Sequence, residues 1–231
     1  MPAYDSITIP YLFVILVWMP ASAIRSYWRL KSGKPLGPKP RRYRAMIASQ
    51  IFVLAYSLLA ARENRISLLG HAPAAWIWVV TTFYLGLLAF VLRNVWRRLS
   101  QERKQRARRL LPENSREMRY WIPISLLAGL SEEYAFRGVA YVALRELTGS
   151  PPISVAICVL AFAVAHIAQG WRGVLGTGII AMAMHVIVFL TAGLYLPIAA
   201  HAAYDLVVGV IAMQNFVRDD AVSAMNPQPV T

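Results

Sequence analysis

Long apolar runs alternate with short polar connections along the whole chain. A run of about 17 to 25 residues is long enough to cross a bilayer as a helix. Runs of this kind predict seven membrane-spanning helices: Ile7 to Ile24, Ala45 to Ala61, Pro73 to Leu92, Tyr120 to Leu144, Ile153 to Ala168, Val174 to Thr191 and Tyr195 to Gln214. Because Pro123 or Gly129 can interrupt the fourth run, the pattern also allows an eighth, short segment.

The pattern predicts an all-α, polytopic membrane protein with its polar site inside the helix bundle. Composition agrees, since 58% of the 231 residues are hydrophobic and only 15% are charged. We expect an N-terminal three-helix membrane region over residues 1–119 and a second helical bundle over 120–214, which holds the candidate chemistry. The last residues, 215–231, have the composition of a disordered tail.

Positive charge is concentrated in the connections over residues 25–44 and 93–119, and the net charge of the chain is +13. The positive-inside rule places both connections in the cytoplasm, with the N-terminus outside the cell membrane. With seven spans the C-terminus is cytoplasmic. The expected partners of these basic loops are anionic lipid headgroups rather than nucleic acid. The second connection has helical composition, and it either lies on the headgroups or forms a solvated linker.

Three charged residues, Glu132, Glu133 and Arg137, interrupt the fourth apolar run. Each charge at the centre of a bilayer helix costs about 2.5 to 3.5 kcal/mol, so the cluster needs a reason. Glu133 and Arg137 are four residues apart on one helix face, where they can form an ion pair. Glu132 points about 100° away from Glu133. It is therefore the candidate for an unpaired carboxylate in a dry environment, where a carboxylate can act as a general base.

Two later runs place polar residues at the same four-residue spacing. His166 follows Phe162, and Asp205 follows His201, so each pair lies on one helix face. Polar side chains in lipid face the bundle interior, so we expect these groups to converge with the charges of the fourth run. His185 has no acid at this spacing, and an interhelical hydrogen bond explains it better than a site role.

Glycines recur through the second half of the chain. Within a membrane, a glycine lets two helices approach closely. We expect this role for Gly129, Gly138, Gly173, Gly176, Gly178 and Gly193.

Together, the three polar patterns resemble the motifs of a known family, the CPBP intramembrane endopeptidases, which include CAAX prenyl proteases and Abi-type (bacteriocin-immunity) proteins. The matching patterns, in order, are Glu132-Glu133-x-x-x-Arg137, Phe162-x-x-x-His166 and His201-x-x-x-Asp205. The resemblance covers about Trp121 to Val210, and the first three helices add only compatible hydrophobicity.

The resemblance implies a role for each residue of the first two motifs. Glu132 and His166 would activate a water molecule that attacks a peptide carbonyl. Glu133 and Arg137 would pair and shape the site. These roles agree with the chemistry of a desolvated carboxylate acting as a general base.

The third motif departs from the family pattern. The resemblance implies that His201 and residue 205 hold the developing oxyanion, but the family commonly has Asn where this chain has Asp205. An ionised aspartate only accepts hydrogen bonds, so Asp205 must be protonated, orient His201 or bind a metal. His166, His201 and one carboxylate can supply three zinc ligands. No His-Glu-x-x-His motif is present, so zinc is the second choice as cofactor.

The resemblance implies an intramembrane endopeptidase, glutamate-type or metal-dependent, that acts on membrane-associated or prenylated CAAX-type proteins or peptides. A non-catalytic membrane immunity or scaffold protein is one alternative, with the polar cluster as interhelical glue. A proton-coupled transporter is another, although no internal repeat is evident. Substitution of Glu132 by Gln separates these readings, because it keeps the size of the side chain and removes the base.

Overall fold

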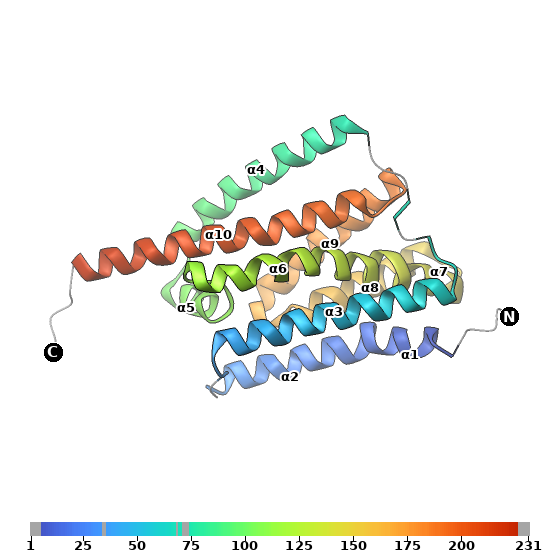
Figure 1. Ribbon diagram of the computed structural model, residues 1–231, viewed down its shortest axis with the longest axis horizontal. Helices are drawn as coiled ribbons and strands as arrows, with labels where there is room; N and C mark the ends of the chain where they lie inside the picture. The colour runs from blue at the N-terminus through green and yellow to red at the C-terminus, as the bar shows by residue number, and fades with distance from the viewer. Residues whose placement is uncertain (1–5, 34–35, 68, 71–73, 226–231) are drawn as a thin grey trace.

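The computed structural model describes residues 6–33, 36–67, 69–70 and 74–225, which form a bundle of helices running side by side (Figure 1). The helices of the described chain are, in order, α1 (Thr8–Phe13), η1 (Val14–Trp18), α2 (Met19–Lys31), α3 (Lys39–Glu63), α4 (Ala75–Arg97), α5 (Gln101–Leu110), α6 (Ser115–Glu133), η2 (Tyr134–Ala140), α7 (Tyr141–Thr148), α8 (Pro151–Ala165), η3 (Ile167–Gln169), α9 (Trp171–Thr191) and α10 (Tyr195–Met225). Outside them, one isolated antiparallel bridge joins Gly70 and Gly193 among the described residues. The all-α prediction is confirmed.

Five helices of the described chain are long and apolar enough to cross a membrane, which confirms a polytopic membrane protein. They are Thr8–Lys31, Lys39–Glu63, Ala75–Arg97, Trp171–Thr191 and Tyr195–Ala221. The two other expected spans do not meet this criterion. The continuous helix from α6 to α7 carries its charges at its centre, and the apolar helix α8 has only 15 residues. The count of seven or eight spans stays a prediction.

The fourth apolar run forms one continuous helix through α6, η2 and α7, so neither Pro123 nor Gly129 interrupts it. Its irregular part is η2, a π-helical segment that begins at Tyr134, directly after the paired glutamates. Such segments are rare and occur frequently at functional sites. The position of η2 therefore draws attention to the same stretch as the charges do.

The expected disorder after residue 214 is wrong for residues 215–225, because α10 remains helical as far as Met225. The ring of Phe216, which is fully buried, lies 5.0 Å from the ring of Trp96. The Arg108 guanidinium of α5 lies 4.6 Å from the Phe216 ring and binds Asp220 at 2.5 Å. The polar residues that indicated disorder are thus partners of cations on α5. The prediction for residues 226–231 lies outside the described residues.

Both basic connections lie at the end of the bundle from which α10 projects, and α1 begins at the opposite end (Figure 1). The second connection contains α5, as its composition suggested. Lys39 at the start of α3 forms an ion pair with Glu113 after α5, and Arg42 donates a hydrogen bond to the Arg109 carbonyl at 2.7 Å. This shared position is what a common cytoplasmic side requires. The side of the membrane itself stays a prediction.

Candidate active site

The candidate site lies where α6 packs against both α10 and α3, at the junction of α6 with η2, which also packs against α3. Gly129 permits the close contact of α6 with α10. A β-carbon at Gly129 would lie 2.7 Å from the Ala202 nitrogen and 2.8 Å from the Ile198 carbonyl oxygen, which is closer than real β-carbons come. The role expected of glycines is therefore observed at Gly129. It is not observed at Gly176, where a β-carbon would meet no described atom within 4 Å.

Glu133 is fully buried and is the centre of a charged cluster. Its Oε1 accepts from Arg137 Nη1 at 3.2 Å and from His201 Nδ1 at 2.7 Å. Arg137 also donates to the Ala181 carbonyl at 3.3 Å, and its guanidinium lies 4.5 Å from the centre of the Phe162 ring. The predicted pairing of Glu133 with Arg137 is present. The same Glu133 carboxylate also binds His201 of α10.

Glu132 points elsewhere and has a different partner. Its Oε1 accepts from Gln50 Nε2 of α3 at 2.7 Å, and the Gln50 amide oxygen in turn accepts from the Ser131 hydroxyl. The other oxygen, Oε2, is buried and has no hydrogen-bond partner among the described residues. Glu132 is therefore a desolvated carboxylate with one fixed oxygen and one free oxygen, as its position on the helix suggested.

His201 faces both remaining carboxylates with its second nitrogen. Nε2 lies 3.8 Å from Glu132 Oε2 and 3.8 Å from Asp205 Oδ2, too far for a hydrogen bond to either. Because Nδ1 is bonded to Glu133, Nε2 carries a proton only when the ring is an imidazolium. Glu133 rather than Asp205 orients the ring. The Asp205 backbone is itself held, since its carbonyl accepts from Trp121 Nε1 at 2.9 Å.

His166 joins the cluster through an aromatic ring rather than through a polar contact. Its Nδ1 lies 2.8 Å from the Phe162 carbonyl oxygen, so Nδ1 donates and Nε2 is left as an acceptor. The Phe162 ring lies 4.6 Å from the His166 ring and 6.1 Å from the His201 ring. In the described part of the chain, no ion pair links His166 to a carboxylate, although His166 and Asp205 interact electrostatically.

Sequence reasoning missed Gln50, which comes from the N-terminal region and contacts the candidate base directly. The available signal was chemical: Gln50 is the one amide side chain in the apolar run from Ala45 to Ala61. Amide side chains in membrane helices commonly bond across helix interfaces. His185 is buried with its ring 5.7 Å from that of Tyr141. This contact is an aromatic one, so the interhelical hydrogen bond expected for His185 stays a prediction.

The second expectation, a zinc site, needs three ligands close together. Among the described residues, no group of three or more His, Cys, Asp or Glu side chains is arranged to hold a metal ion. The residues do not fit a zinc site in this geometry, so we derive no reaction step through a metal.

Residues 114–207 match the family model described as type II CAAX prenyl endopeptidase Rce1-like. The match confirms the resemblance to the CPBP family for residues 114–207, which make up less than half of the chain. The Rce1-like region begins at Asn114, whose side chain caps α6 by accepting from the Glu117 amide, and it ends within α10. It contains all six candidate residues but not Gln50. Searches of curated proteins and of solved structures find no match to the chain.

Proposed function

We propose that this chain is an intramembrane endopeptidase that hydrolyses a peptide bond of a membrane-anchored, CAAX-type protein or peptide. The observation that carries the proposal is the Glu132 carboxylate, held at one oxygen by Gln50 and buried without a hydrogen-bond partner at the other. A carboxylate positioned in this way is a suitable general base. The Rce1-like match supports the reaction class and the substrate class.

In the proposed reaction, a water molecule binds between Glu132 Oε2 and His166 Nε2. Glu132 removes a proton from the water, and the water oxygen attacks the carbonyl carbon of the peptide bond. Glu132 then delivers this proton to the amide nitrogen as the carbon–nitrogen bond breaks. The products are a carboxylic acid and an amine. His166 suits its part because its Nδ1 is occupied by the Phe162 carbonyl, which leaves Nε2 as an acceptor.

His201 is the proposed donor to the oxyanion that forms on the carbonyl oxygen. Its Nδ1 bonds to Glu133 at 2.7 Å, which favours the imidazolium form with a proton on Nε2. A fixed donor in a dry site stabilises developing charge strongly. Arg137 neutralises Glu133 from the other side and keeps that carboxylate in place.

Charge balance favours a protonated Asp205 among the three roles open to it. Arg137 and an imidazolium His201 supply two positive charges, which ionised Glu132 and Glu133 match. A third buried negative charge would be uncompensated and therefore costly. Protonated Asp205 supplies an O–H donor close to His201 Nε2, the same capacity that an asparagine amide would offer.

The deciding experiment is cleavage of a farnesylated, membrane-anchored CAAX peptide by purified protein in proteoliposomes. We expect Glu132→Gln to reduce the rate by about 10²- to 10⁴-fold, the usual contribution of a general base. The His166→Ala variant should also cleave the peptide more slowly than the wild type. Glu146→Gln is the matched control, because it makes the same chemical change at an exposed position of α7, on the same continuous helix.

Undiminished cleavage by Glu132→Gln would overturn the mechanism. No cleavage by the wild type, with the Glu132→Gln variant still functional in cells, would favour a scaffold. Proton-gradient-dependent flux without a cleaved product would favour a transporter. Zinc analysis of the same preparation assigns the catalytic type, since activity retained by metal-free protein requires Glu132 as the base.

A further inference from the structure

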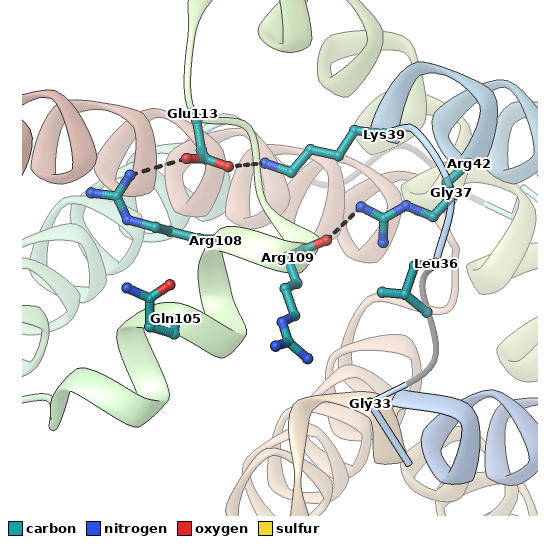
Figure 2. A pocket seen from close by; sticks show the side chains of 9 residues that line it. All are labelled: Gly33, Leu36, Gly37, Lys39, Arg42, Gln105, Arg108, Arg109 and Glu113. Atoms are coloured by element: carbon teal, nitrogen blue, oxygen red, sulfur yellow. Dashed lines mark hydrogen bonds and ion pairs between the residues drawn. The ribbon is translucent and has the colours of Figure 1, made fainter. Parts of the chain in front are cut away.

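A cavity of about 450 Å³ opens where the α2–α3 connection meets α5, at the basic end of the bundle (Figure 2). None of the six candidate active-site residues lines it. The cavity lies beside the end of α2 and the start of α3, where two candidate membrane spans end. The ends of such spans lie at the level of the lipid headgroups. The cavity is therefore placed where a headgroup can reach it.

Cations dominate the lining of this cavity. The lining contains one carboxylate, Glu113, and four cationic side chains: Lys39, Arg42, Arg108 and Arg109. Glu113 is already neutralised twice, by Lys39 at 2.5 Å and by Arg108 at 3.0 Å (Figure 2). The two remaining arginines have no acidic partner among the described residues. The wall of the cavity thus has an excess of positive charge.

Both unpaired arginines retain hydrogen-bond donors. Arg42 Nη2 donates a hydrogen bond to the Arg109 carbonyl, but Arg42 Nε is buried and has no hydrogen-bond partner among the described residues. The Arg109 side chain extends away from α5 and makes no contact with the other residues drawn (Figure 2). Guanidinium groups match the geometry of phosphate oxygens and bind them with two parallel hydrogen bonds.

An adjoining cavity of about 340 Å³ shares Gln105 and Arg109 with the first. Its lining adds three residues of α2, two of α5 and one of η3, namely Tyr27, Leu30, Lys31, Glu102, Arg106 and Ala168. Aromatic residues such as Tyr27 are typical of the membrane interface. A cationic cavity beside one that combines apolar side chains with charged ones suits a phosphate attached to a glycerol backbone better than a free phosphate ion.

We propose that the paired cavities bind the headgroup phosphate of an anionic phospholipid, with Arg42 and Arg109 as the principal donors. The phosphate bridges α3 and α5 and fixes this end of the bundle at the membrane surface. Selective binding requires placed arginines rather than general positive charge, and this distinction can be tested. The site is independent of the proposed peptidase activity.

The test uses full-length protein in a neutral detergent and measures bound dioleoyl-phosphatidylglycerol by native mass spectrometry. The variant Arg42→Gln/Arg109→Gln should bind about tenfold more weakly than the wild type, because it loses charge-assisted donors to the phosphate. The matched control is Arg41→Gln/Arg103→Gln. It removes the same charge from the same two segments at exposed positions that line neither cavity, and it should bind as the wild type does.

Equal weakening in both double variants would show diffuse attraction and overturn the site, as would no lipid binding by the wild type. Glycerol 3-phosphate in the same titration separates the two sources of phosphate. Binding of glycerol 3-phosphate as tight as that of the lipid would overturn the lipid assignment. Should the double variant not fold, Arg109→Gln alone, at an exposed position, carries the test.

Discussion

The two charged clusters of this chain differ in how their charges are neutralised. At the basic end, every carboxylate in the network has a cation close by. Lys39 binds Glu113 and Glu117, and Arg108 binds Glu113 and Asp220. These side chains are partly exposed, so water also shares in solvating them.

Inside the bundle, carboxylates outnumber the cations that can neutralise them. Three carboxylates share one arginine and one histidine, and the second oxygens of both Glu132 and Glu133 are buried without hydrogen-bond partners among the described residues. Buried charges that lack full compensation lower stability and tend to persist where chemistry needs them. The comparison therefore separates a structural clamp at the basic end from the incompletely compensated cluster to which we assign the proposed reaction.

Removal of Arg137 is expected to have the largest effect on stability and therefore tests the comparison most directly. Arg137→Met removes one of the two cations that compensate the buried Glu133, which should cost about 3 to 5 kcal/mol of stability and abolish cleavage. Thermal unfolding in detergent measures the loss. Arg145→Met, an exposed arginine of α7 on the same continuous helix, should unfold at nearly the wild-type temperature. Equal losses in the two variants would contradict the central role of the ion pair.

The close contact between α6 and α10 gives the next largest effect. Gly129→Ala places a methyl group against the α10 backbone, so we expect a loss of about 1 to 3 kcal/mol and displacement of His201 from the glutamates. Unfolding and cleavage should both be affected. Gly176→Ala adds the same methyl group in open space on α9 and should change neither. A Gly129→Ala variant as stable and active as the wild type would refute the assigned helix contact.

Gln50 tests whether the N-terminal region positions the base. Gln50→Leu removes the donor to Glu132, and we expect kcat to fall about tenfold to a hundredfold with KM unchanged, because the carboxylate is no longer held in place. Ser57→Ala serves as the control, since it removes a buried hydrogen bond of α3 to Tyr11 and leaves the Gln50–Glu132 contact in place. That variant should lose stability but keep its kcat. A fall in kcat of the same size in both would indicate a general effect of α3.

The smallest effect is expected at the basic end. Lys39→Met breaks two ion pairs that are 13 to 31% exposed, so it should cost about 1 kcal/mol or less. The difference from wild type should shrink in high salt, which screens partly exposed charges. Unfolding temperatures at low and high salt measure it, and cleavage should be unchanged. A loss as large as that of Arg137→Met would remove the distinction between the two clusters.

Much of the fold followed from local pattern, and the failures have a common cause. The order of helices and the continuous fourth helix could be anticipated from apolar runs. The helical extension of α10 could not, because Phe216 and Asp220 look like tail residues until Arg108 lies beside them, 112 residues away from Asp220 in sequence. Whether a polar segment is ordered depends on the residues that it contacts, and the hydrophobic pattern of the segment itself does not reveal them.

The site divides in the same way. The pairing of Glu133 with Arg137 could be predicted because a helix brings residues four apart onto one face. The contact of Glu132 with Gln50 spans 82 residues, and nothing in the apolar run that holds Gln50 indicates which helix this side chain faces. Motif spacing therefore found the residues of the Rce1-like region but missed a partner outside it.

The sequence by itself determined a helical membrane protein, two basic connections and three polar motifs, because helix geometry and apolar run length are local properties. Only the tertiary structure decided which groups meet. In it, His201 forms a hydrogen bond with Glu133, and Gln50 donates one to Glu132. His166 bonds to the Phe162 carbonyl. The reason is physical: these contacts depend on how helices far apart in sequence pack, and packing is set by the whole bundle at once.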